Sequence, residues 1–160
     1  MKKILLGLVV VFAMLFATTS ESKAQSALLV QGGYSWSEGV AAVGYQYGGL
    51  AALVGYMPAK MPGSGETVSG VVFNVKIAPQ WDGDGYYASY AYNSVGYRSQ
   101  YNINSTGWTG DYVEGMHILS LGYKVGSYSG MYLAADVGYG WCGSGSGMSW
   151  GIVLGWAIGN

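Results

Sequence analysis

The sequence predicts an all-β protein: an eight-stranded antiparallel up-and-down transmembrane β-barrel that follows a cleaved signal peptide. Three observations predict it. The 160-residue chain has 28 glycines and is 51% hydrophobic but only 9% charged, whereas about a quarter of the residues are charged in ordinary soluble domains. Its apolar residues alternate with a period of two from residue 26 onward, and an export signal precedes them.

The start of the chain predicts export. A basic pair follows Met1, the 14 residues from Ile4 to Ala17 are apolar, and Ser22 and Ala24 are the small residues that a signal peptidase recognises. Fourteen apolar residues are fewer than the ~20 that cross a membrane as a helix. We therefore expect residues 1–24 to be a cleaved signal peptide and 25–160 to form one domain.

The remaining chain favours a barrel over a helical membrane protein. Gly, Ser, Tyr and Asn interrupt every apolar run before it approaches ~18 residues, so no transmembrane helix is expected there. A closed barrel is the other structure that satisfies its backbone in lipid. The few, scattered Lys and Arg residues argue against a nucleic-acid partner. Cys142 is the single cysteine, which excludes an internal disulfide but leaves open whether it is free or bridges two molecules.

Alternation is clearest in the last segment. One face holds only large apolar residues, namely Met148, Trp150, Ile152, Leu154, Trp156 and Ile158. The opposite face holds smaller residues, namely Ser149, Gly151, Val153, Gly155 and Ala157. In a soluble sandwich the second face would carry many charges. Small and isolated polar residues instead suit the interior of a narrow barrel whose large apolar face meets lipid.

Seven turn-rich breaks divide the chain into eight expected strands. These are 26–36, 39–47, 50–57, 68–78, 86–103, 112–125, 129–141 and 147–158. The fifth segment changes phase near Asn93 and Ser94, so it contains either a bulge or a turn. A turn would make nine strands instead of eight.

The alternation assigns side chains to the two faces. The polar interior is expected to contain Gln31, Gln46, Asn74, Lys76, Glu114, Ser120, Lys124 and Asp136. Its charges balance, and we expect them to be paired, so that the interior is plugged and does not conduct. The aromatic girdle at the lipid headgroups is expected to contain Tyr34, Trp36, Tyr45, Tyr56, Tyr123, Tyr139, Trp141, Trp150 and Trp156.

The chain resembles the small eight-stranded outer-membrane barrels typified by the OmpX and OmpA barrel domains. The resemblance covers residues 26–158 and rests on pattern. Its most specific part is the final strand, where Ser149, Gly151, Leu154 and Trp156 fit the assembly signal of such proteins, although four residues follow Trp156 where an aromatic usually ends the chain. The resemblance implies a location in the cell outer membrane, contact with its lipid and with the barrel-assembly machinery, and termini in the periplasm.

The leading functional hypothesis is a porin-like but closed barrel that serves the cell envelope or surface interaction. Its outer loops, especially 58–67 and 98–111, would contact a protein or surface ligand that the sequence does not identify. No cofactor or metal is implied. A secreted, self-associating β protein is one alternative, because exposed strands assemble edge to edge.

A lipid-modifying enzyme of the same fold is the other alternative. Barrels that modify lipid A use a His with Ser or Asp, and His117 is the only histidine here. Ser120 and Glu114 are three residues from it and so face the opposite way, while Asp111 shares its face at a distance of ~20 Å. Whether the chain is an enzyme therefore stays uncertain, and a noncatalytic role is favoured.

Overall fold

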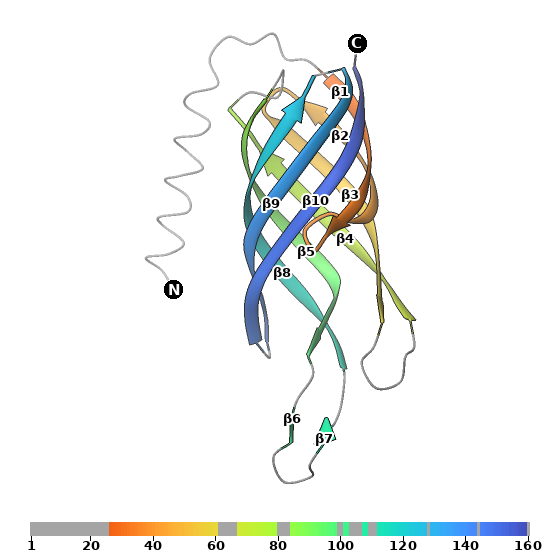
Figure 1. Ribbon diagram of the computed structural model, residues 1–160, viewed down its shortest axis with the longest axis vertical. Coiled ribbons are helices and arrows are strands. Elements are labelled where there is room, and N and C mark those ends of the chain that lie inside the picture. The colour runs from red at the N-terminus through yellow and green to blue at the C-terminus, as the bar shows by residue number, and fades with distance from the viewer. Residues whose placement is uncertain are drawn as a thin grey trace.

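The computed structural model describes residues 26–60, 67–79, 84–98, 101–102, 107–108, 112–127, 129–143 and 145–159 (Figure 1). The expected signal peptide, residues 1–24, lies outside this part of the chain. Eight strands form a closed barrel: β1 (Ser26–Ser35), β2 (Gly39–Tyr47), β3 (Leu50–Lys60), β4 (Thr67–Ile77), β5 (Gly85–Arg98), β8 (Tyr112–Gly126), β9 (Gly130–Cys142) and β10 (Gly145–Gly159). Two short strands, β6 (Tyr101–Asn102) and β7 (Gly107–Trp108), pair with each other between β5 and β8. The all-β class and the count of eight barrel strands are thus confirmed.

The topology is an antiparallel meander that closes on itself. Each barrel strand pairs with its neighbours in the chain, and β1 pairs with β10 from Ala27↔Gly159 to Ser35↔Gly151. Closure removes the free edges that an open sheet would expose. The start of β1 lies beside the end of β10, at one end of the barrel (Figure 1). In the described residues, no helix is long and apolar enough to cross a membrane.

A bulge explains the phase change in the fifth strand. Between β5 and β8 the register passes from Asn93↔Met116 to Gly96↔Glu114, so two residues of β5 oppose one of β8. Asn93 stabilises the bulge, since its Oδ1 accepts a hydrogen bond from the Val95 amide at 2.9 Å. The bulge interpretation is confirmed and the turn that would have made nine strands is wrong.

Two apolar clusters fill much of the interior. The larger one lies toward the termini and contains Ala27, Leu29, Ala42, Ala51, Leu53, Ala78, Tyr87, Tyr132, Ala134, Val153 and Ala157. The smaller one contains Met57, Val72, Ala91 and Ile118, with Trp36, Val40 and Met116 packed against it. Small residues dominate because an eight-stranded barrel is only wide enough to be filled by side chains. Buried polar side chains lie inside the barrel together with these clusters.

Candidate functional site: a polar interior and an apolar outer wall

Polar and charged side chains line the inside of the barrel. Of the eight residues expected there, seven are buried: Gln31, Gln46, Asn74, Lys76, Ser120, Lys124 and Asp136. Glu114 lies in β8, but its side chain is outside the described part of the structure. Six further polar residues are buried: Ser35, Ser37, Glu38, Ser89, Asn93 and Ser149. Of these, Ser149 was expected on the inward face of the last strand.

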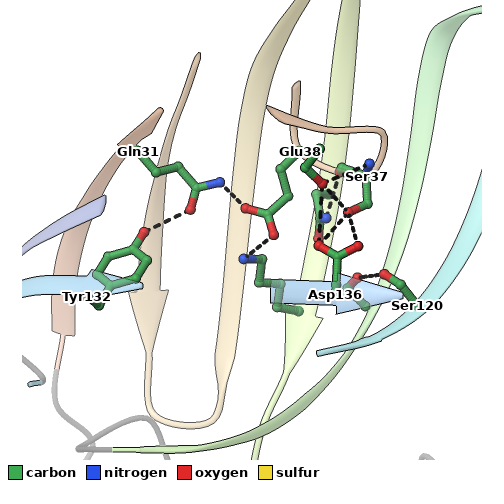
Figure 2. Close-up of polar contacts among 10 residues, drawn as sticks. Gln31, Ser37, Glu38, Ser120, Tyr132 and Asp136 are labelled. Carbon is green, nitrogen blue, oxygen red and sulfur yellow. Dashed lines mark hydrogen bonds and ion pairs between the residues drawn. The ribbon is translucent and has the colours of Figure 1, made fainter. Parts of the chain in front are cut away.

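A chain of polar contacts crosses the interior and centres on Glu38 (Figure 2). The Lys76 ammonium lies 2.6 Å from Oε1 of Glu38, and both side chains are almost completely buried. Gln31 donates its amide N–H to the other oxygen of Glu38. The Tyr132 hydroxyl donates to Oε1 of Gln31 at 2.8 Å. Strands β1, β4 and β9 are thereby linked to the Glu38 carboxylate, whose charge is compensated by Lys76.

A second polar group surrounds Asp136. The Ser37 hydroxyl donates to Asp136 at 3.2 Å and the Ser35 hydroxyl at 3.4 Å. Asn74 donates its side-chain N–H to the carbonyl of Ser37 at 2.7 Å. These contacts join β1, β4 and β9 through the residues that follow β1. A separate pair, Ser89 and Ser120, links β5 to β8 with its hydroxyls 2.6 Å apart.

The turn between β1 and β2 enters the barrel. Ser37 and Glu38, which lie between the expected strands 26–36 and 39–47, are only 0% and 1% exposed. Gly39 adopts a φ of 85°, which favours glycine, and reverses the chain there. Gly55 on β3 allows the turn to approach, because a Cβ at Gly55 would collide with the Glu38 carbonyl. The turn therefore acts as an internal plug, which we define as residues 36–38.

One cavity inside the barrel lies beside both buried lysines. A cavity of about 10 Å³ lies between Gln46, Lys76, Lys124 and Tyr132. That volume is about what one water molecule requires. The Lys124 ammonium lies 5.5 Å from the centre of the Tyr132 ring, and the Lys76 ammonium lies 4.7 Å from that of Tyr87, both close enough for cation–π attraction. Both buried lysines therefore contact tyrosine rings. This cavity is too small to admit a solute larger than water.

The outer wall has the opposite character. Among residues whose side chains are described, exposed apolar groups cover every barrel strand, and four of the five charged side chains are buried inside: Glu38, Lys76, Lys124 and Asp136. The fifth, Asp84, is exposed just before β5, where its carboxylate accepts a hydrogen bond from the Gly126 amide at 2.8 Å. The described wall of the strands therefore carries no outward charge.

Most residues of the expected girdle lie on this wall. The exposed ones are Tyr34, Tyr45, Tyr56, Tyr123, Tyr139, Trp150 and Trp156. Trp141 is half-buried and stacks on His117, with ring centres 5.8 Å apart. Trp36 instead belongs to the plug and packs partly buried against the smaller interior cluster. Its position follows from the inward path of the turn, which a strict alternation along β1 does not predict.

The final strand divides the expected assembly residues between its faces. Ser149 and Gly151 are buried, whereas Leu154 and Trp156 are exposed. At the connection between β9 and β10, the Cys142 thiol donates a hydrogen bond to the Gly145 carbonyl at 3.4 Å.

Of the residues considered for catalysis, the two whose side chains are described, His117 and Ser120, are not brought together. The His117 ring packs on the outer wall between Tyr90, Tyr92 and Trp141, with ring centres 5.2 to 6.0 Å apart. Ser120 faces inward and contacts Ser89. Asp111 lies outside the described residues, as do parts of the loops 58–67 and 98–111. Within the described chain, no cluster of three His, Cys, Asp or Glu side chains is positioned to hold a metal ion.

Comparison of the chain with protein-family models, curated proteins and solved structures found no match.

Proposed function

We propose that this chain is a small outer-membrane β-barrel protein with a plugged, non-conducting interior, which serves envelope structure or surface interaction through the loops opposite its termini. The observation that carries the proposal is the inverted polarity of the barrel. Four charged side chains are buried inside it, while the described wall is apolar. A water-soluble barrel requires the reverse arrangement, because exposed apolar surface of this extent is not sustained in water.

The height of the apolar wall also supports a membrane location. On β10 the outward residues from Met148 to Ile158 are all exposed and apolar. Ten residue steps of ~3.3 Å, tilted by ~40°, rise about 25 Å. That is about the height of the apolar band of outer-membrane barrels. Trp150 and Trp156, each one outward position inside an end of this stretch, are aromatic residues of the type that concentrates at membrane interfaces.

The interior supports a role other than transport. The Glu38–Lys76 ion pair and the plug occupy the space through which a solute would pass. Function is then left to the ends of the barrel and to its wall. Under the orientation implied by the resemblance, the connections between β3 and β4 and between β5 and β8 face the outside of the cell and would contact the partner.

The closed ring weighs against a secreted fibre-forming protein, since β1 and β10 pair with each other instead of offering free edges. The opposed faces of His117 and Ser120 weigh against a lipid-modifying enzyme. The secreted alternative also does not explain why the charges are inside the barrel.

The test is the gel mobility of the mature chain with and without boiling, after refolding in detergent, combined with circular dichroism and planar-bilayer recording. A mobility shift on boiling, a β-sheet spectrum and no steady conductance are expected. A chain that stays soluble or forms fibrils in plain buffer, without a shift, would overturn the membrane location. A steady conductance with a normal shift would overturn the closed interior alone.

A further inference from the structure

An apolar groove crosses the outer wall over strands β1 to β5. It has a volume of about 480 Å³, and its lining includes Tyr45, Ala52, Phe73, Tyr90 and Tyr92. That volume is typical of sites that hold small ligands. The groove exists because Ala52 is the small member of an outward row, paired with Tyr45 on one side and Val75 on the other. The larger neighbours stand around Ala52 and form the sides of the groove.

A polar pair adjoins the groove. The Tyr90 hydroxyl lies 2.7 Å from Nδ1 of His117. Tyr90 and Tyr92 both line the groove, and both rings contact His117. When the Tyr90 hydroxyl donates to Nδ1, the neutral imidazole carries its proton on Nε2 and is a hydrogen-bond donor there. The groove and a donor group are therefore side by side on one wall.

The pair lies on the side of the groove that faces away from the termini. A row of outward residues runs across the strands through the pairs Val43↔Val54, Val54↔Phe73, Phe73↔Tyr92 and Tyr92↔His117, and ends with His117↔Trp141. Trp141 is one residue from the end of β9, whereas Val43 lies in the middle of β2. The row thus approaches the loop end of the barrel as it reaches His117, which is the end where headgroups of the outer leaflet would lie.

We propose that the groove and the His117–Tyr90 pair bind one acylated lipid that carries a phosphate, with an acyl chain over Ala52 and a phosphate oxygen accepting a hydrogen bond from the His117 ring. The inference rests on the proposed membrane location, which makes this wall continuous with the lipid-facing surface. An acyl chain suits the groove because the described side chains that line it are almost wholly apolar. Lipid tails are as apolar as the wall, so selectivity comes from close packing in the groove and from the polar pair.

Native mass spectrometry of the mature chain, folded in detergent with dimyristoyl phosphatidylethanolamine, tests the proposal. The wild type is expected to retain one lipid per chain. Ala52→Phe fills the groove from the lipid side, so the acyl chain loses packing contacts there, and retention is expected to fall about three- to tenfold. Ala135→Phe is the matched control, since Ala135 is also an exposed alanine on a barrel strand but lies on β9, away from the groove. It is expected to retain lipid as the wild type does.

The headgroup contact is tested with His117→Phe. This variant is expected to retain less phosphatidylethanolamine but as much dimyristoylglycerol, which has the same chains and no phosphate. Equal retention of the phospholipid by the wild type and His117→Phe would overturn the phosphate contact. Equal lipid retention by Ala52→Phe and Ala135→Phe, whether high or low, would overturn the groove as the lipid site. A wild type that forms a dimer, which Ala52→Phe abolishes, would also overturn it, because a second chain would then occupy the groove.

The shift in gel mobility on boiling separates the failure of the proposed membrane location from the failure of the lipid site. A wild type that shows no shift refutes the membrane location and this inference with it. A wild type that shifts normally but retains no lipid refutes the lipid site alone.

Discussion

Replacing Lys76 with methionine tests whether the interior depends on charge pairing. The side chain keeps nearly the same length but loses the ammonium that lies 2.6 Å from Glu38. Glu38 is 1% exposed, and the carbonyl of Glu38 lies close against Gly55 of β3. Gln31 continues to donate to Glu38, but one neutral hydrogen bond does not replace a counter-charge.

The expected loss follows from this burial. Breaking a buried ion pair by removing one partner typically costs about 3 to 5 kcal/mol, because an uncompensated charge is left behind. Removing both charges, as in Glu38→Gln with Lys76→Met, is expected to restore most of that stability, since neither charge then remains buried alone. The coupling between the two sites is therefore expected to be at least about 2 kcal/mol.

Urea unfolding in lipid vesicles, followed by gel mobility and tryptophan fluorescence, measures these differences. The full cycle requires the wild type, both single variants and the double variant. A cost below about 1 kcal/mol for Lys76→Met, the range of a solvent-exposed pair, would refute the buried network. A double variant that is as unstable as the sum of the two single variants would refute the coupling.

Three further outcomes are expected. Val137 is 60% exposed on the outer wall. In lipid vesicles, Val137→Arg is expected to lower the free energy of unfolding by about 2 to 4 kcal/mol, whereas a surface change in a soluble protein lowers it by about 0.5 kcal/mol or less. The urea midpoints of the variant and the wild type decide between the two. Gly55→Ala should destabilise by about 1 to 3 kcal/mol through collision with the plug, and Gly32→Ala, whose Cβ meets only an ordinary 3.6 Å contact, should not; equal midpoints would contradict the plug. Asn93→Ala removes two hydrogen bonds that hold the bulge and the plug and should cost about 2 to 3 kcal/mol, measured in the same way.

Alternation along the strands made most of the fold predictable. A period of two fixes which face each residue occupies once the strand is placed, so Lys76, Lys124 and Asp136 could be assigned to the interior from their phase alone. The bulge near Asn93 could be located from the same signal, because one extra residue reverses the phase. Its distinction from a turn depended on pairing with β8, which the local sequence does not encode.

The plug could not be predicted for a related reason. Ser37, Glu38 and Gly39 have the composition of an ordinary exposed turn, and nothing local indicates that the turn bends inward. The causes lie elsewhere in the chain, in Lys76 on β4 and Gly55 on β3. The difference in strand length is the available hint, since β2 has 9 residues and β10 has 15, which leaves the β1–β2 turn within the height of the barrel. Trp36 followed the turn inward for the same reason.

On the proposed membrane location, the plug and the apolar wall follow from one constraint on a narrow barrel. Charges on the wall would be costly in lipid, and charges inside require partners because an eight-stranded barrel holds little water. The inward turn supplies Glu38 as a partner for Lys76 and places Ser37 against Asp136, so the residues that satisfy the interior are also those that close it. An opening large enough for a solute would separate these pairs and lose their stabilisation. Recognition is therefore expected at the loop end and on the wall, where side chains can vary without breaking the interior network.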